Sequence, residues 1–472
     1  MSTLGDLTVP NIDQSGPYKT GEFTYIDISS IDNKLKRIVE PKCLPASAAP
    51  SRAKQRLQPG DVMVSMTRPN LNAVAIVSPD LEGAVGSTGF HVLRAVGGIE
   101  SRWLLYAVQT NDFVEAMSSL VQGALYPAVR PKDIRAFGIE APPLDEQRLI
   151  VAEIEKQFSR LDEAVANLNR VKTNLKRYKA SVLKAAVEGK LTEDWRKAHP
   201  NVEPASKLLE RILIERRCRW EEDQISKFKG KGQEPPKNWK EKYKEPVSPH
   251  GSNLLPLPKE WCRATLDQTL WHLRSGTAET SRRESTDYPV LKSSAVRHGV
   301  IDFEDLNYLQ RSQSFRPENF LRRGDFLITR LSGSLDYVGC SAVVKDVACE
   351  GIQYPDRVFC GKLVTGTGGT YLCYCFQHSG IRKALEEAAK STAGHQRISM
   401  SDLYPLTLPL PPVAEQQRIV SEVERRLSVI EELESAVQAN LIRADRLRQA
   451  ILARAFHFGC SRVSPRTAAP GS

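Results

Sequence analysis

The sequence has no run of 18 consecutive apolar residues, which excludes an ordinary membrane-spanning helix. Its nine cysteines are scattered and include no Cys-x-x-Cys pair, so neither a zinc ribbon nor a thioredoxin-type redox site is indicated. The first residues, MSTLGDLTVP, have neither a basic start nor an apolar stretch, so no secretory signal is expected. These absences favour a cytoplasmic protein with reduced thiols and no metal site.

Signatures of catalysis are also missing. No GxxxxGK[ST] phosphate-binding loop occurs, and no Asn-Pro-Pro or Asp-Pro-Pro precedes an aromatic residue, as a DNA amino-methyltransferase requires. Glu188 and Lys190 match only half of a nuclease carboxylate-x-lysine signature, with no aspartate of a predicted strand nearby. We therefore expect no catalytic residue and no cofactor held by this chain, and interpret it as a binding protein.

Charge gives the first indication of a partner. Lys and Arg number 66 against 56 Asp and Glu, a formal net charge of +10. An excess of this size suits nucleic acid as the ligand, although a merely solvated basic surface is also compatible with it.

Most of the chain is an internal repeat. APPLDEQRLIVAEIEKQ (from position 141) and LPPVAEQQRIVSEVERR (from position 410) share identities that are always 269 residues apart. The identical positions of the first copy include Pro143, Glu146, Gln147, Ile150, Val151, Glu153 and Glu155. Upstream, QPGDVMVSMTR (58–68) resembles RRGDFLITRLS (322–332). The chain is therefore a duplication.

Each copy has the same order of predicted elements. Short β-branched runs broken by Gly, Pro, Asn and Asp come first, which predicts an α+β domain of roughly 140 residues. A helix of about 40 residues follows, with apolar residues at spacings of three and four, typical of a coiled-coil seam. The predicted segments are a first domain (1–141), a helix (142–190), a charged helix with an extended Lys/Pro-rich linker (191–255), a second domain (256–409), a second helix (410–459) and a disordered tail (460–472).

The repeat predicts a symmetric arrangement. If the two long helices pair as an antiparallel coiled coil, the domains lie at opposite ends and are related by a pseudo-two-fold axis. DNA-binding dimers use such symmetry to contact two half-sites. Because the two domains differ in sequence, we expect an asymmetric, split DNA target whose gap is set by the helices.

At this point the ordered motifs resemble a known family, the specificity (HsdS) subunits of Type I restriction–modification enzymes. The resemblance rests on PPLDEQR, PPVAEQQR, YIDISSIDNKLKRIVEPK (25–42), TRPNLNAVAIV (67–77) and LPLPKEW (255–261), and covers about residues 5–459. The first copy departs from the family in beginning at LGDL without a Leu-Pro lead-in.

The resemblance implies two target-recognition domains, each binding one half of a bipartite sequence in double-stranded DNA. It also implies that the helices dock two methyltransferase subunits, with restriction (translocase) subunits as further partners. S-adenosylmethionine, ATP and Mg²⁺ would then belong to the partners. The shared Glu-Gln at both helix starts predicts a partner contact through Glu146, Gln147, Glu415 and Gln416.

Candidate DNA-binding residues are donor side chains in segments between predicted strands. They are Arg68, Asn70, Asn72, Tyr126, Arg130 and Lys132 in the first copy, and Arg330, Ser332, Ser334, Tyr337, His395, Gln396 and Arg397 in the second. Turn formation by Asn, Pro, Gly and Ser, with solvated arginines, explains the same residue types.

Two other functions stay open from the residues alone. One is a coiled-coil scaffold protein that does not bind a DNA sequence. The other is a self-sufficient nuclease or methyltransferase, which the missing motifs disfavour.

Overall fold

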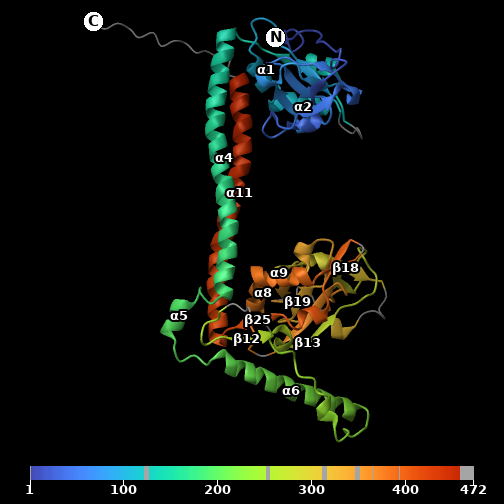
Figure 1. Ribbon diagram of the computed structural model, residues 1–472, viewed down its shortest axis with the longest axis vertical. Coiled ribbons are helices and arrows are strands. Elements are labelled where there is room, and N and C mark those ends of the chain that lie inside the picture. Colours follow the sequence, from blue (N-terminus) through green and yellow to red (C-terminus); the bar gives the residue numbers. More distant parts are fainter. Residues whose placement is uncertain are drawn as a thin grey trace, which may run out of the picture. The chain divides into compact units, whose positions relative to one another are not determined.

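The computed structural model describes residues 2–121, 127–250, 256–310, 316–345, 351–364, 366–392 and 394–457. The chain divides into two compact units (Figure 1). Unit 1 comprises Met1–Val171 and Ala436–Ser472, and unit 2 comprises Lys172–Ser435. The predicted tail from 460 onwards lies outside the described residues.

Unit 1 contains two main sheets and three short helices. One sheet has the order β5-β2-β9-β6, in which β2 and β9 are parallel, and the other is the antiparallel sheet β10-β7-β8. The strands are β1 (Ser2–Thr3), β2 (Glu22–Ile26), β3 (Ile31–Asp32), β4 (Arg37–Ile38), β5 (Lys42–Pro45), β6 (Ala53–Arg56), β7 (Val62–Ser65), β8 (Val74–Ile76), β9 (Val85–Ser87), β10 (Phe90–Leu93) and β11 (Gly138–Ile139). The helices are α1 (Ser101–Ala107), α2 (Asn111–Ser119) and α3 (Pro131–Arg135). Trp103 of α1 is buried in the core against the β7 side chains Val62 and Val64.

Unit 2 is built around the antiparallel sheet β13-β22-β19-β21. Its strands are β12 (Cys262–Thr265), β13 (Leu270–Ser275), β14 (Ser281–Arg282), β15 (Pro289–Leu291), β16 (Val296–Arg297), β17 (Val300–Ile301), β18 (Leu306–Leu309), β19 (Phe326–Thr329), β20 (Leu331–Ser332), β21 (Ser341–Val343), β22 (Val358–Leu363), β23 (Lys390–Thr392), β24 (His395–Arg397) and β25 (Thr407–Leu410). Its helices are α5 (Glu193–Ala198), α6 (Ala205–Gly230), α7 (Leu266–Thr269), α8 (Gly369–Gln377), α9 (Ser379–Ala388) and α10 (Met400–Leu403). Phe326 and Phe376 meet edge to face in its core, 5.4 Å between ring centroids.

In both units the first strand pairs with the strand that precedes the long helix. In the first copy this strand was hard to predict, because the sequence before it is short. In unit 2, β12 follows the lead-in LPLPKEW and pairs with β25, just before the second long helix. In unit 1, the two-residue strand β1 pairs in the same way with β11. The first strand is therefore present, in shortened form.

The long helices are α4 (Leu144–Val187) and α11 (Val413–His457). Both begin directly after a Pro-Pro pair, because the rigid prolines end the preceding strand and leave the first amides of the helix free. α4 ends at Val187, and Gly189 two residues later has a φ of +74°, the left-handed conformation that stops a helix. The Lys190 amide donates back to the Ala185 carbonyl at 2.9 Å.

Within each unit the two long helices run antiparallel. In unit 1, Leu452 of α11 packs on Phe158 and Ile154 of α4, and the Arg448 guanidinium lies 4.3 Å from the centroid of the Phe158 ring. In unit 2, the end of α4 (Val182–Val187) shares a core with Val423 near the start of α11. The α+β class and the pairing of the long helices are confirmed, while the pseudo-two-fold axis stays a prediction.

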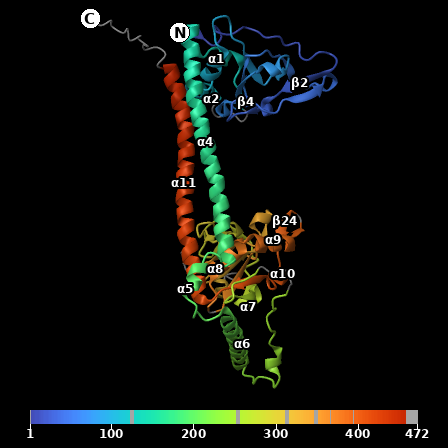
Figure 2. The ribbon, with the colours of Figure 1, turned by 60° about the vertical axis from the view of Figure 1, so that its left-hand side comes forward.

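The segment between the repeats differs from the extended linker that its lysines and prolines indicated. α6 continues to Gly230, and the chain then returns beside it (Figure 2). Trp239 stacks on Trp220 of α6 with ring centroids 5.8 Å apart, and the Val247 amide donates to Asp267. Composition suggested an unpacked chain, but aromatic side chains spaced along it bury against the helix.

No helix in the described ranges combines the length and apolarity that crossing a membrane requires. Cys373 and Cys375 lie on α8, and burial raises the pKa of each thiol to about 12. Both are therefore buried thiols.

Candidate nucleic-acid interface

In unit 1 the structure brings the two predicted clusters of the first copy together. Thr67 forms an antiparallel bridge with Ala128, and the Arg68 amide donates to the Pro127 carbonyl at 2.9 Å. The segment 67–72 therefore lies beside the segment 127–130, although about 60 residues separate them in sequence. Tyr126, predicted with them, lies outside the described residues.

The loop that carries Arg68 and Asn72 is strained. Arg68 and Asn72 have φ angles of 49° and 45°, and Lys36 on a neighbouring turn has a φ of 54°. These are the three positive values recorded for non-glycine residues in the described chain. Left-handed backbone at such residues costs energy and gathers at functional sites.

Lys36 holds this loop, and sequence reasoning missed it. Its Nζ donates to the Asn72 carbonyl at 2.5 Å, and Asn72 Nδ2 donates to the Val108 carbonyl at 2.8 Å. Burial, with the Arg448 guanidinium nearby, lowers the pKa of Lys36 to about 8. Asn72 is thus occupied within the chain, and the only sequence signal for Lys36 was the turn-forming Asp32 ahead of it.

Three candidates of unit 1 keep their polar groups available. Arg68, Asn70 and Lys132 are exposed, with no side-chain hydrogen bond or ion pair recorded to described residues. Arg130 is also exposed, but its guanidinium contacts Asp133 at 3.2 Å across the start of α3. The structure therefore singles out Arg68, Asn70 and Lys132 as the side chains best placed to contact a ligand.

Unit 2 joins its two predicted clusters in the same way. β20 and β24 pair antiparallel, with Leu331 opposite Arg397 and Ser332 opposite Gln396, and β23 extends the sheet. His395, Gln396 and Arg397 were expected in a loop and instead form strand β24. The chain reverses after β23 because Gly394 adopts a left-handed φ of 77°. As a result β24 pairs with β23 on one side and with β20 on the other.

The second-copy candidates divide into anchored and free side chains. Arg330 donates to the Asp356 carbonyl at 3.1 Å and lies over the Phe359 ring, so its guanidinium supports the fold. Ser334 caps the turn that follows it by accepting from the Asp336 amide. Arg397 is exposed, and no partner for its guanidinium is recorded in the described part of the chain.

Tyr337, the remaining candidate, is 44% exposed beside an arginine that sequence reasoning missed. The Arg297 guanidinium lies 4.4 Å from the centroid of the Tyr337 ring, an arrangement that orients both groups. Gln396 is half-buried and His395 is exposed. Arg397 is thus the candidate on β24 whose side chain has no partner recorded among the described residues.

The Glu-Gln pairs at the helix starts have a different role from the predicted partner contact. Gln147 is fully buried; its Nε2 donates to the carbonyls of Pro142 and Gly98, and its Oε1 accepts from the Glu100 amide. Gln416 makes the same set with the carbonyls of Pro411 and Gly366 and the Gly368 amide. Each glutamine therefore ties a long helix to its own domain, because both of its amide hydrogens and its carbonyl oxygen are used internally.

Glu415 is also buried, in an ion pair. Its carboxylate accepts from Arg196 at 2.7 Å, Thr192 at 2.7 Å and the Trp261 indole at 2.8 Å. Glu146, at the matching position of unit 1, is half-exposed with no side-chain partner recorded among described residues. Of the four residues predicted to contact a partner, Glu146 is the one whose side chain stays accessible.

Across the described residues, no group of three or more His, Cys, Asp or Glu side chains has the arrangement of a metal site. What the two surfaces offer is exposed arginine, lysine and amide donors on two separate units. Such donors bind phosphates and the edges of bases.

Comparisons with known proteins show which proteins the chain resembles. No protein-family model matches it. It is 27% identical over 404 residues to the EcoKI Type I restriction enzyme specificity subunit of Escherichia coli K12, covering 85% of this chain and 75% of that one. It is 24% identical over 450 residues to the EcoEI specificity subunit of Escherichia coli, covering 83% and 72%.

Solved structures share the fold. A chain from a structural study of complex assembly and conformational transition in the type I R-M system superimposes with a TM-score of 0.70 at 23% identity, over 96% of both chains. The HsdS subunit of Thermoanaerobacter tengcongensis gives 0.52 at 24% identity, over 96% of this chain and 95% of that one. The chain is therefore similar in sequence to specificity subunits of Type I restriction enzymes, and it shares the fold of an HsdS subunit.

Proposed function

We propose that this chain is the DNA-binding specificity subunit of a Type I restriction–modification complex and recognises a bipartite, asymmetric target in double-stranded DNA. One observation carries the proposal: both units build the same paired segment, residues 67–72 with 127–130 and β20 with β24, from different side chains. Two similar scaffolds with different donors suit two different half-sites.

The chain is proposed to be non-catalytic. It lacks the nucleotide-binding and methyltransferase motifs named above, and its relatives are specificity subunits. Methylation and restriction are then carried out by two methyltransferase subunits and by restriction subunits in the cytoplasm. S-adenosylmethionine, ATP and Mg²⁺ would be bound by those subunits.

The long helices carry the features expected of a docking surface for the methyltransferase subunits. Apolar side chains on α4 and α11 that remain 43–71% exposed are available for burial. They are Leu149, Val171, Tyr178, Val429, Leu433, Ile442 and Leu447. A scaffold that does not bind a DNA sequence is disfavoured, since the relatives are named for specificity.

A methylation map tests the proposed function. DNA from cells that carry this chain with its methyltransferase partner is compared with DNA from cells that carry the partner alone. We expect a new split, asymmetric methylated motif only when the chain is present. No new motif, with the complex formed and the partner shown to be active, would refute recognition of DNA by this chain.

Arg68 and Arg397 are predicted to contact the target. Arg68→Ala and Arg397→Ala are each expected to weaken binding of the assembled complex to its mapped site by about tenfold or more, because one good base contact contributes about 1–3 kcal/mol. Fluorescence anisotropy with a labelled duplex measures the affinity. Arg68→Ala should relax only one half of the motif and Arg397→Ala only the other.

The control for both variants is Lys383→Ala, which removes an exposed cation of α9 that pairs with Glu387. Its affinity should stay within twofold of the wild type. Unchanged affinity and an unchanged motif in both arginine variants would remove these residues from the interface.

A further inference from the structure

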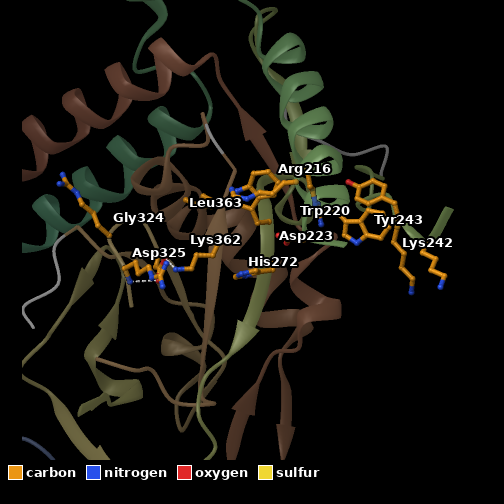
Figure 3. Close-up of a pocket in the computed structure, with 15 residues that line it drawn as sticks. Arg216, Trp220, Asp223, Lys242, Tyr243, His272, Gly324, Asp325, Lys362 and Leu363 are labelled. Atoms are coloured by element: carbon orange, nitrogen blue, oxygen red, sulfur yellow. Dashed lines mark hydrogen bonds and ion pairs between the residues drawn. The ribbon is translucent and has the colours of Figure 1, made fainter. Parts of the chain in front are cut away.

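Unit 2 contains a basic cleft that the DNA-binding proposal does not use. One wall is the second half of α6 with the returning segment 242–244, and the other is formed by β13, the end of β22 and the loop 322–325 before β19 (Figure 3). Its volume is about 810 Å³. It is therefore large enough for several side chains of a ligand.

The lining of the cleft carries seven cations and two carboxylates. Two of the cations are neutralised within the chain: Arg216 pairs with Asp267 at 2.8 Å, outside the cleft lining, and Lys362 pairs with the buried Asp325. The others make no ion pair with described residues: Arg219, Lys242, Lys244, Arg322 and Arg323. Repulsion among these five is relieved by an anionic ligand.

The aromatic rings of the cleft are already covered. Trp220 packs against Tyr243 with ring centroids 5.3 Å apart, in addition to its stacking on Trp239. The Arg219 guanidinium lies 4.4 Å from the centroid of the Trp271 ring. Binding of single-stranded nucleic acid depends on open aromatic faces for base stacking, so this lining favours carboxylates over bases.

Two polar atoms of the lining are buried without a partner in the described structure, Tyr243 Oη and His272 Nδ1. Buried polar groups are normally hydrogen-bonded, and leaving one unpaired costs about 1–3 kcal/mol.

The position of the cleft separates it from the predicted DNA contacts of the same unit. Arg322 and Arg323 precede β19, whereas Arg330 follows it and leads into β20. Residues 322–325 form a turn, and β19 (Phe326–Thr329) spans about 13 Å at about 3.3 Å per residue. The cleft therefore lies at the opposite end of β19 from β20.

We propose that this cleft binds an acidic segment of a protein partner. The inference rests on the proposed function, in which the chain works inside a complex of several subunits. Arginine is one of the residues that contribute most to protein interfaces, and the cleft combines three unpaired arginines with two unpaired lysines. Carboxylates of the partner would lie between the two walls, against Arg322 and Arg323 on one side and Lys242 and Lys244 on the other.

The test measures binding of the full-length chain to the purified methyltransferase subunit and, separately, to the purified restriction subunit, without DNA. Arg322→Glu/Arg323→Glu is expected to weaken binding of one of them at least tenfold in 50 mM salt, and less in 300 mM salt, where charges are screened. Lys242→Glu/Lys244→Glu, on the opposite wall, should act in the same direction. The matched control is Arg282→Glu/Arg283→Glu, an exposed pair outside the cleft with the same change of charge.

Three other outcomes would each overturn the inference. Binding of both subunits that neither cleft variant changes would overturn the inference alone. If the cleft variants bound both subunits as the wild type does, but bound a 20-nucleotide oligothymidine or a labelled duplex more weakly, the inference would be overturned in favour of nucleic acid. A wild-type chain that binds neither subunit would overturn the proposed function and this inference together.

Discussion

Glu415→Ala is expected to lower the free energy of unfolding of unit 2 by about 3–5 kcal/mol, because it leaves the Arg196 guanidinium in a mostly buried site without its anion. The variant also removes the acceptor for Thr192 and for the Trp261 indole. Urea unfolding measures the loss, with tryptophan fluorescence as the signal. Unit 2 holds five of the six tryptophans, one of them Trp261 itself.

The duplication provides the control for this variant. Glu146 occupies the same position of the first repeat, but its side chain is half-exposed and has no recorded partner. Glu146→Ala should therefore change stability by no more than about 0.5 kcal/mol, as surface substitutions do. Equal effects of the two variants would contradict the assignment of Glu415 to a buried ion pair.

Gln147→Leu and Gln416→Leu are expected to destabilise units 1 and 2 respectively, each by about 3 kcal/mol or more. Leucine keeps the approximate volume of glutamine, but it leaves one amide and two carbonyls without their partner in a buried site, at about 1–3 kcal/mol each. Hydrogen–deuterium exchange locates the effect. Protection should fall at Glu100 in the first variant and at Gly368 in the second, whose amides bind these glutamines.

Gln157→Leu on α4 is the matched control, since its recorded side-chain hydrogen bond joins it to the exposed Glu153. It should leave exchange at Glu100 unchanged. If the Gln147 and Gln416 variants each altered both units equally, the glutamines would not act as separate attachments of each helix to its own domain.

Much of the organisation was readable from the sequence. The repeat at a constant offset identified two copies, and the three-and-four spacing of apolar residues predicted each long helix to within three residues at either end. These features are local: a Pro-Pro pair starts a helix and an apolar stripe maintains it whatever surrounds them. The resemblance to HsdS subunits rested on the same local motifs.

The residues of the two candidate DNA-binding surfaces could be predicted only in part from the sequence. Donor side chains between strands marked the right segments, but their availability depends on neighbours distant in sequence. Arg330 and Arg397 are both arginines between predicted strands. Arg330 donates to the Asp356 carbonyl, whereas Arg397 has no partner recorded among the described residues. Lys36, which supports the Arg68 loop, had no motif of its own.

The sequence by itself determined that this protein is a duplicated α+β chain with two long helices, and that it resembles the Type I specificity subunits. Only the tertiary structure decided that the helix-start glutamines and Glu415 are internal attachments, that β24 is a strand, and that residues after α6 fold back to form a basic cleft. The physical reason is that motifs depend on neighbours within a few residues. Burial, hydrogen-bond partners and unpaired charge depend instead on segments that meet only when the chain has folded.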